Sequence, residues 1–250
     1  QLELHGRKTF LAEKENDSPL IQGSIPFNLL YQKKANDQMR MTFHAVLDEV
    51  MLSLPWFSYY KKLGEGASCH LEATSSKEEG VVIQQGILTG KNLHATISGS
   101  WGKPASVLKI SKMQIGEALG HLTIRNKGKR LKLTGNINEF DALTLLNQLP
   151  ESDSSPSSLL ESLDFNLSID TLIFSDSYHL KNASLMLQLT DHELQTIHLK
   201  DQAEGFDFMV TPAKGGVQAF NLESTNAAEL LEILSPGNDL RAGKINFIGQ

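Results

Sequence analysis

Apolar and polar residues alternate with a period of two along much of this 250-residue chain. Successive side chains of a β-strand point to opposite faces, so this pattern indicates strands that bury one face. The clearest runs lie at residues 131–134, 165–170, 185–189, 197–199, 206–210, 220–222 and 245–247. Gly, Asn and Asp residues separate the runs at short intervals, as the tight turns of an antiparallel meander require. We therefore expect a mainly β fold of about a dozen antiparallel strands.

Three short stretches have helical rather than alternating spacing. Residues 141–149 place apolar side chains along one helical stripe, and Pro150 follows as a stop. Residues 226–234 form a similar stripe, and Asn226 is suited to cap its first turn. A third short helix is expected near residues 48–60, interrupted by a proline. The predicted fold thus contains two or three short helices beside the sheet.

One stretch of the chain has the composition of a linker. Residues 151–158 contain Glu, Asp, Ser and Pro but no apolar side chain. We expect them to separate a β-rich segment at residues 1–150, which ends in a short helix, from a second β-rich segment at residues 159–250. Residues 244–250 form a strand pattern with no turn after it, which predicts a second segment truncated at its C-terminal edge.

Charge and cysteine content restrict the partners. The net charge of -6 argues against a nucleic-acid-binding protein, because phosphate recognition needs a clustered excess of Lys and Arg. Cys69 is the only cysteine, so the chain can form no internal disulfide and no zinc or iron-sulfur site built from cysteines. No run of about 18 apolar residues occurs, so no membrane anchor is expected within these residues.

The sequence lacks the motifs of common enzyme classes. It contains no G-x-S-x-G nucleophile elbow, no P-loop and no Gly-rich dinucleotide fingerprint. His192, Glu193 and His198 come closest to a metal-ligand set, but their spacing fits no standard zinc motif. We therefore predict a protein without catalytic residues, bound metal or cofactor. An enzyme on a β-sandwich, such as a glycan hydrolase, is the last-ranked alternative.

Three blocks of the chain share the element order of a known family. Residues 90–105 give a strand followed by a turn that contains Trp, Lys and Pro, and residues 140–146 give a strand that runs into an Asp-led helix. Residues 221–249 give a helix followed by a glycine-led strand, with Asn226 and Ala228 where an Asp and a Gly are usual. These blocks resemble the AsmA-like family of Gram-negative envelope proteins, in particular the C-terminal region of its bridge-like lipid-transfer type.

The resemblance implies an architecture and a cellular setting. Members of the family are anchored in the inner membrane, lie in the periplasm and take part in outer-membrane biogenesis. Their long curved antiparallel sheet forms a groove-like or taco-like shape that carries phospholipid between the inner and outer membrane. By this resemblance we expect a non-enzymatic scaffold for lipid transport, whose membrane anchor belongs to a part of the parent chain absent here. The expected partners are phospholipid and other envelope proteins.

The candidate site is a set of apolar side chains in the second β-rich segment. These are Phe165, Leu167, Ile169, Leu185, Leu187, Leu189, Phe206, Phe208 and Val210. Either they fill the closed core of a structural or interaction β-sandwich, or they line an open groove that solvates acyl chains at about 0.8 kcal/mol per buried methylene. The residues alone favour the filled core, because filled cores outnumber lipid grooves, whereas the family resemblance favours the groove.

Two smaller clusters are secondary candidates. The basic cluster of a predicted hairpin turn is suited to contact anionic headgroups, although a solvated turn that discourages edge pairing is the favoured interpretation. An aromatic cluster around a proline is suited to a groove mouth, although packing beneath a short helix is favoured. The basic cluster is Arg125, Lys127, Lys129 and Arg130, and the aromatic cluster is Trp56, Phe57, Tyr59 and Tyr60.

Overall fold

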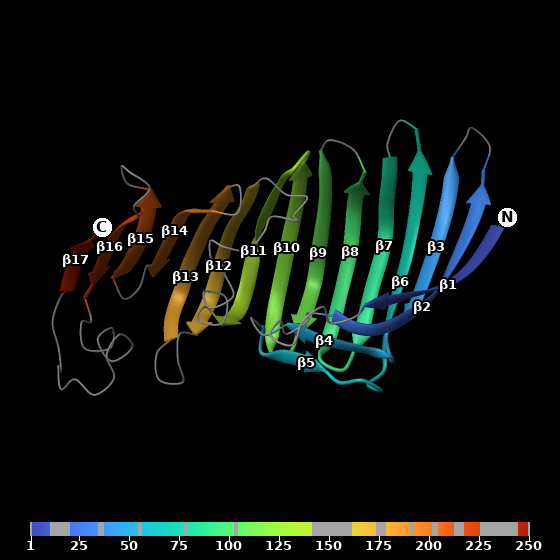
Figure 1. Ribbon diagram of the computed structural model, residues 1–250, viewed down its shortest axis with the longest axis horizontal. Coiled ribbons are helices and arrows are strands. Elements are labelled where there is room, and N and C mark those ends of the chain that lie inside the picture. The colour runs from blue at the N-terminus through green and yellow to red at the C-terminus, as the bar shows by residue number, and fades with distance from the viewer. Residues whose placement is uncertain are drawn as a thin grey trace. The chain divides into compact units, whose positions relative to one another are not determined.

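The fold is mainly β, as the alternation predicted. The computed structural model describes residues 2–10, 21–34, 38–54, 57–77, 80–102, 105–141, 162–173, 179–190, 193–201, 205–212, 218–225 and 245–249. These residues form 17 strands and no α-helix. The chain divides into two compact units, unit 1 (Gln1–Lys127) and unit 2 (Gly128–Gln250). In Figure 1 the strands of unit 1 run from blue to green and those of unit 2 from olive to red.

Unit 1 is an antiparallel sheet with one inserted hairpin. Its strands are β1 (Leu2–Phe10), β2 (Ile21–Lys33), β3 (Met39–Val46), β4 (Val50–Leu54), β5 (Tyr59–Lys61), β6 (Ala67–Ser76), β7 (Gly80–Gly90), β8 (Leu93–Trp101), β9 (Ser106–Ile115) and β10 (Ala118–Lys127). The main ladder has the order β1-β2-β3-β6-β7-β8-β9-β10, with antiparallel pairing throughout. Short turns such as Lys91-Asn92 connect neighbouring strands, which confirms the predicted meander in this unit.

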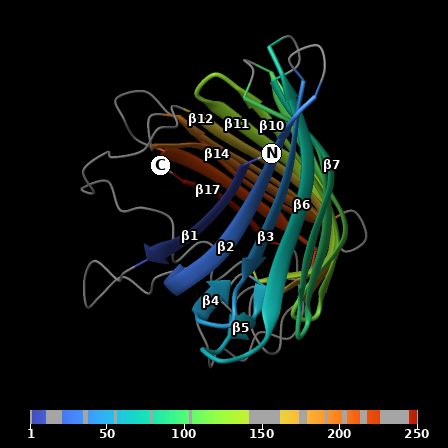
Figure 2. The ribbon, with the colours of Figure 1, turned by 90° about the vertical axis from the view of Figure 1, so that its right-hand side faces the viewer.

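The inserted hairpin, β4 with β5, leaves the main ladder where β2 changes its partner. β2 pairs with β3 at residues 27–33 but with β4 at residues 21–23, and β5 continues from β4. Gly23 permits this change, because its φ is +122° and a Cβ there would lie 2.1 Å from the carbonyl oxygen of Glu49. Figure 2 shows β4 and β5 on the inner side of the curved sheet of unit 1, near one rim.

The short helix predicted near residues 48–60 is wrong, because β4 and the start of β5 occupy most of the described residues of this stretch. The local sequence, Val-Met-Leu-Ser-Leu, suits a strand as well as a helix. Pairing with β2 and β5 supplies the backbone hydrogen bonds that a local helix would otherwise supply. β4 ends at Leu54, directly before Pro55, which has no N–H to donate to a ladder.

Unit 2 is a single ladder whose strands pair in chain order. They are β11 (Arg130–Asp141), β12 (Ser162–Ile173), β13 (His179–Thr190), β14 (Glu193–Asp201), β15 (Phe206–Pro212), β16 (Gln218–Ser224) and β17 (Ile245–Gly249). The pairs from β12 to β17 are antiparallel, but β11 and β12 are parallel. The predicted antiparallel sheet is therefore observed in this unit at every described pair except β11–β12. Residues 142–161 separate the two strands, a length sufficient for the crossover that parallel neighbours need.

Three sequence predictions fall on other parts of the chain. The helix at residues 141–149 lies outside the described residues except for Asp141, the last residue of β11. The helix at residues 226–234 and the linker at residues 151–158 also lie outside them. The domain boundary near residue 150 therefore stays a prediction. The strand predicted within residues 244–250 is observed as β17.

Candidate functional site

The nine candidate side chains of unit 2 lie on one face of its sheet. Two cross-strand rows follow from the register, Leu167–Leu185–Leu199–Phe208 and Phe165–Leu187–Ile197–Val210. Ile169, Leu189 and Phe206 have the same parity along their strands, so they extend this face. Ile197 and Leu199 were not among the nine, and they complete both rows. We call this set the unit 2 face.

The unit 2 face is largely buried. Ile169 and Leu187 are 1% exposed and Leu167 is 2% exposed, whereas Phe165, Leu189 and Phe208 are partly exposed. The opposite face is polar, and there Asp207 lies 3.0 Å from His198 Nε2 and 3.7 Å from Lys200 Nζ. The predicted separation into an apolar and a polar face is thus observed.

Unit 1 has an apolar face of its own, and none of its residues is among the nine candidates. Its central row crosses the whole main ladder as Leu4–Leu29–Phe43–Leu71–Gly86–Ile97–Ile110–Leu122. We call this row and its same-face neighbours the unit 1 face. The large side chains of the row from Leu29 to Leu122 are partly exposed, and Leu4 is 47% exposed. Large apolar side chains therefore reach solvent across successive strands of this unit.

Local irregularities hide the unit 1 face from a simple alternation pattern. The pairing of β7 with β8 shifts between Ile83 and Gly86, and the pairing of β8 with β9 shifts between His94 and Thr96. Lys112 has a φ of +50°, which interrupts the alternation within β9. The alternating Met39, Met41, Phe43 and Ala45 of β3 was the available signal, because both flanking strands continue it in register.

The β4–β5 hairpin covers one end of the unit 1 face. The hydroxyl of Tyr59 donates to the carbonyl oxygen of Lys91 at 3.2 Å, in the turn between β7 and β8. A Cβ at Gly116, in the turn between β9 and β10, would lie 2.9 Å from the carbonyl oxygen of Phe57. The buried residues near this end are mostly small, namely Ala45, Ala67, Ala95 and Ala118, together with Leu93 and Met113. The buried side chains near the covered end are thus mostly small, whereas the side chains of the central row in the open part are mostly large.

Lys61 stabilises the hairpin from within. Its side chain is 2% exposed, and its Nζ donates to the carbonyl oxygens of Val50 at 2.8 Å and Lys62 at 3.2 Å. Burial lowers the pKa of Lys61, and the carboxylates of Asp48 and Glu65 act in the opposite direction. Burial likewise raises the pKa of Tyr59, with a further contribution from Glu65. Because carbonyl oxygens accept from the Lys61 ammonium, we assign this residue a structural role.

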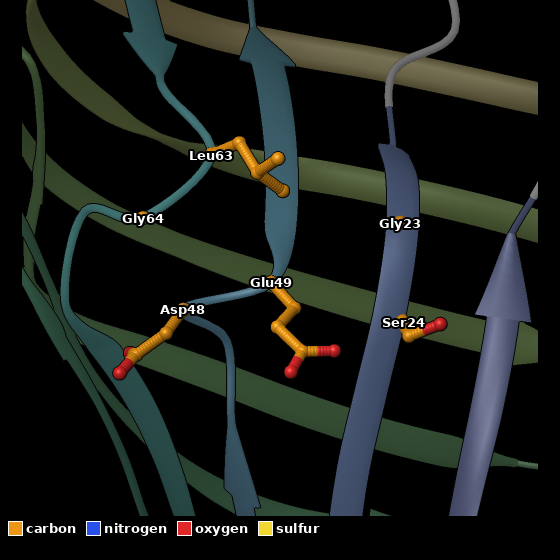
Figure 3. Close-up of a pocket in the computed structure, with 6 residues that line it drawn as sticks. All are labelled: Gly23, Ser24, Asp48, Glu49, Leu63 and Gly64. Carbon is orange, nitrogen blue, oxygen red and sulfur yellow. The ribbon is translucent and has the colours of Figure 1, made fainter.

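A depression of about 420 Å³ lies at the base of the hairpin, lined by Gly23, Ser24, Asp48, Glu49, Leu63 and Gly64 (Figure 3). Asp48 Oδ1 accepts a hydrogen bond from the backbone N–H of Ala67 at 3.0 Å. Glu49 Oε2 lies 3.3 Å from Arg7 Nη1. Both carboxylates therefore support the turn between β3 and β4, at the place where the hairpin leaves the main ladder.

The polar face of unit 1 carries several histidines. The His44 and His70 rings lie 6.4 Å apart, and His70 Nε2 is 3.6 Å from Glu72, which also pairs with Arg40 at 3.1 Å. Within the described ranges, no three His, Cys, Asp or Glu side chains come together as a metal site. Of the sequence-derived trio His192, Glu193 and His198, the structure describes only the side chain of His198, which contacts Asp207.

The structure places the two secondary clusters as follows. Arg125 and Lys127 are exposed at the end of β10, and Lys129 and Arg130 are exposed at the start of unit 2. In the aromatic cluster Tyr59 is buried and Tyr60 is 51% exposed, while Trp56 lies outside the described residues.

The described parts of the chain contain no helix long and apolar enough to cross a bilayer. Comparisons of the chain with protein-family models, with curated proteins and with solved structures each find no match.

Proposed function

We propose that this chain is a non-enzymatic scaffold of the Gram-negative cell envelope, which holds or conducts phospholipid along an apolar groove between the inner and outer membrane. The observation that carries the proposal is the unit 1 face, where large apolar side chains from Leu29 to Leu122 stay partly exposed across successive strands. Soluble proteins seldom leave so continuous an apolar surface open without a ligand for it. The resemblance to the AsmA-like family supports the periplasmic setting and an inner-membrane anchor elsewhere in the parent protein.

The alternative is a structural or interaction module with a closed core. A sandwich needs a second sheet that faces the first at about 10 Å. Among the described strands, each unit forms one connected sheet, and the β4–β5 hairpin covers one end of the unit 1 face. The burial of Leu187 favours a closed core in unit 2. The two candidate functions therefore make different predictions for the unit 1 face.

A charge placed on the unit 1 face distinguishes the lipid scaffold from the closed-core module. Ile97→Asp puts a carboxylate among the apolar side chains of the central row, where an acyl chain could not solvate it. Thr96→Asp is the matched control, because Thr96 is the neighbouring residue of β8 and points to the polar face. The measurements are phospholipid co-purified with each protein, by mass spectrometry, and the melting temperature.

The proposed function predicts phospholipid with the parent protein and with Thr96→Asp. Ile97→Asp should lose most of that lipid and stay folded, because the carboxylate reaches water once the groove is empty. Absence of lipid from the parent preparation, together with unfolding of Ile97→Asp, would instead establish the closed core.

A further inference from the structure

The two rims of the unit 1 sheet differ in charge. At one rim lie the end of β2, the start of β3, the turns from β6 to β7 and from β8 to β9, and the end of β10. Among the described residues of these segments, 33–34, 38–40, 75–77, 80, 101–102, 105–106 and 125–127, six are Lys or Arg and none is Asp or Glu. We call this end the basic rim. Its described cations include Lys34, Lys77 and Lys127, which are exposed.

The opposite rim, which carries the β4–β5 hairpin, holds charges of both signs. Its described charged residues are the acidic Asp48, Glu49, Glu65 and Glu117 and the basic Arg7, Lys61, Lys62 and Lys91, and Arg7 Nη1 lies 3.3 Å from Glu49 Oε2. Asp48 and Glu49 lie in the turn that precedes β4, and Lys61 is buried inside the hairpin. We call this end the hairpin rim. An anion near the sheet is therefore attracted more strongly to the basic rim than to the hairpin rim.

Aromatic residues mark the basic rim on the apolar side of the sheet. Trp101, opposite Val81 in the register, is 42% exposed. Tyr31, opposite Met41, donates its hydroxyl to Met39 Sδ at the same rim. Trp and Tyr combine an apolar ring with a polar tip, and they collect where hydrocarbon meets a polar headgroup layer.

The open part of the face has the length of an acyl chain. Along β8, six residue steps separate Trp101 at the basic rim from Ala95, a buried alanine near the hairpin. At ~3.3 Å per residue this is about 20 Å. One leaflet of a bilayer has a hydrocarbon depth of roughly 15 Å. An acyl chain that lies along the strands therefore fits between the basic rim and the covered end.

We propose that unit 1 binds an anionic phospholipid in one orientation, with the headgroup at the basic rim near Lys34, Lys77, Lys127 and Trp101, and the acyl chains directed toward the β4–β5 hairpin. This inference rests on the proposed function and adds the lipid class and its orientation. Zwitterionic lipid fits the same apolar face but lacks the net charge that the basic rim attracts. The hairpin closes the apolar surface at the other end, so the chains terminate there.

The test is a lipid-selectivity experiment on the whole chain. Parent protein is loaded from vesicles with equal amounts of phosphatidylglycerol and phosphatidylethanolamine, re-isolated, and its lipid quantified by mass spectrometry. The test variant is the triple substitution Lys34→Gln, Lys77→Gln and Lys127→Gln. The control variant is Lys62→Gln, Lys91→Gln and Lys109→Gln, which removes the same charge from exposed positions away from the basic rim.

We expect the parent and the control variant to enrich phosphatidylglycerol, and the test variant to lower that enrichment at least about five-fold, the effect of losing one lysine beside a bound headgroup. The total lipid bound by the test variant should stay close to that of the parent, because the apolar face is unchanged. Lipid bound by the parent in the supplied ratio, or an equal loss of selectivity in both variants, would overturn this inference and leave the proposed function in place. No lipid bound by the parent would overturn both.

Discussion

The two apolar faces of this protein arise from the same sequence pattern but differ in exposure. In unit 2, Leu187 is 1% exposed in the middle of the sheet, whereas Ile97 in unit 1 is partly exposed in a comparable central position. Within unit 1, the face is open over large side chains and covered by the hairpin near small ones. Alternation along a strand therefore decides which face is apolar, and the segments packed against that face decide whether it is open.

The sharpest way to test this difference is to place the same charge on each face. Leu187→Asp should lower the free energy of unfolding by about 4 kcal/mol or more, because it buries a carboxylate with no cation beside it in the apolar rows. Ile97→Asp should cost only about 1–2 kcal/mol, since its carboxylate reaches solvent. Urea unfolding of both variants and the parent measures the difference.

Gln188→Asp is the control for Leu187→Asp, because Gln188 is the next residue of β13 and is exposed on the opposite face. It should change stability by less than about 0.5 kcal/mol. Equal destabilisation by Leu187→Asp and Ile97→Asp would mean that the unit 1 face is as closed as that of unit 2.

A smaller effect is expected from releasing the hairpin that separates the covered and open parts of unit 1. Gly23→Ala should destabilise the hairpin by about 1–3 kcal/mol, because alanine is strained at a φ of +122° and its Cβ collides with the Glu49 carbonyl. Hydrogen exchange of the β4 amides, which this change should accelerate, is the measurement.

Gly64→Ala provides a matched comparison for this substitution. Gly64 also has a positive φ, +85°, but no atom lies within 4 Å of a Cβ built there. Its substitution should cost about 1 kcal/mol and leave exchange in β4 nearly unchanged. If the two variants accelerate exchange equally, the close approach at Gly23 does not hold the hairpin in place.

Much of the fold could be predicted from alternation alone. In β12, β13 and β15, runs such as Phe165-Asn-Leu-Ser-Ile169 contain no bulge, so the nine candidate side chains could be assigned to one face. The hairpin could not be predicted, because a five-residue stretch such as Val50–Leu54 is compatible with helix or strand, and the partner that decides it, β2, is distant in sequence. The parallel pairing of β11 and β12 depends on a crossover that leaves no local signal.

The more exposed face was also the harder one to predict. Bulges within β7 and β9, and glycines such as Gly86 in the central row, interrupt the alternation of unit 1. The basic rim could be predicted only in part. The sequence places Arg125 and Lys127 in one turn, but only the strand order brings Lys34 and Lys77 to the same end of the sheet. A cluster of charges that several turns contribute can therefore be recognised only once the pairing of their strands is known.

The smallest predicted effect concerns Cys69, which faces Ala45 and Leu88 in the unit 1 register and is partly exposed. Burial raises the pKa of this thiol above its ordinary value of 9.0. The folded state thus keeps a proton that the unfolded state releases, so the stabilising contribution is full below pH 9.0 and declines as pH rises toward the folded pKa.

Cys69→Ala removes this contribution and serves as the reference. The stability difference between the parent and Cys69→Ala should shift against the parent as the pH passes 9.0. Tyr59 in the unfolded chain also titrates around pH 10.0, but it is present in both proteins and its contribution cancels in the difference. A difference that does not change with pH would show that the thiol is as accessible when folded as when unfolded, and that the face is more open at Cys69 than the structure indicates.

The central claim, that the unit 1 face contacts phospholipid, is tested most directly by photo-crosslinking from single positions. A benzophenone amino acid is placed at Phe43, on the apolar face with its ring 5.7 Å from that of Phe27, and separately at Thr42, the preceding residue on the polar face. Irradiation in the presence of phospholipid, followed by mass spectrometry of the protein, reports which face the lipid touches. We predict lipid adducts at Phe43 and at most a trace at Thr42. No adduct at either position, or equal adducts at both, would contradict the proposal that this sheet holds lipid on its apolar face.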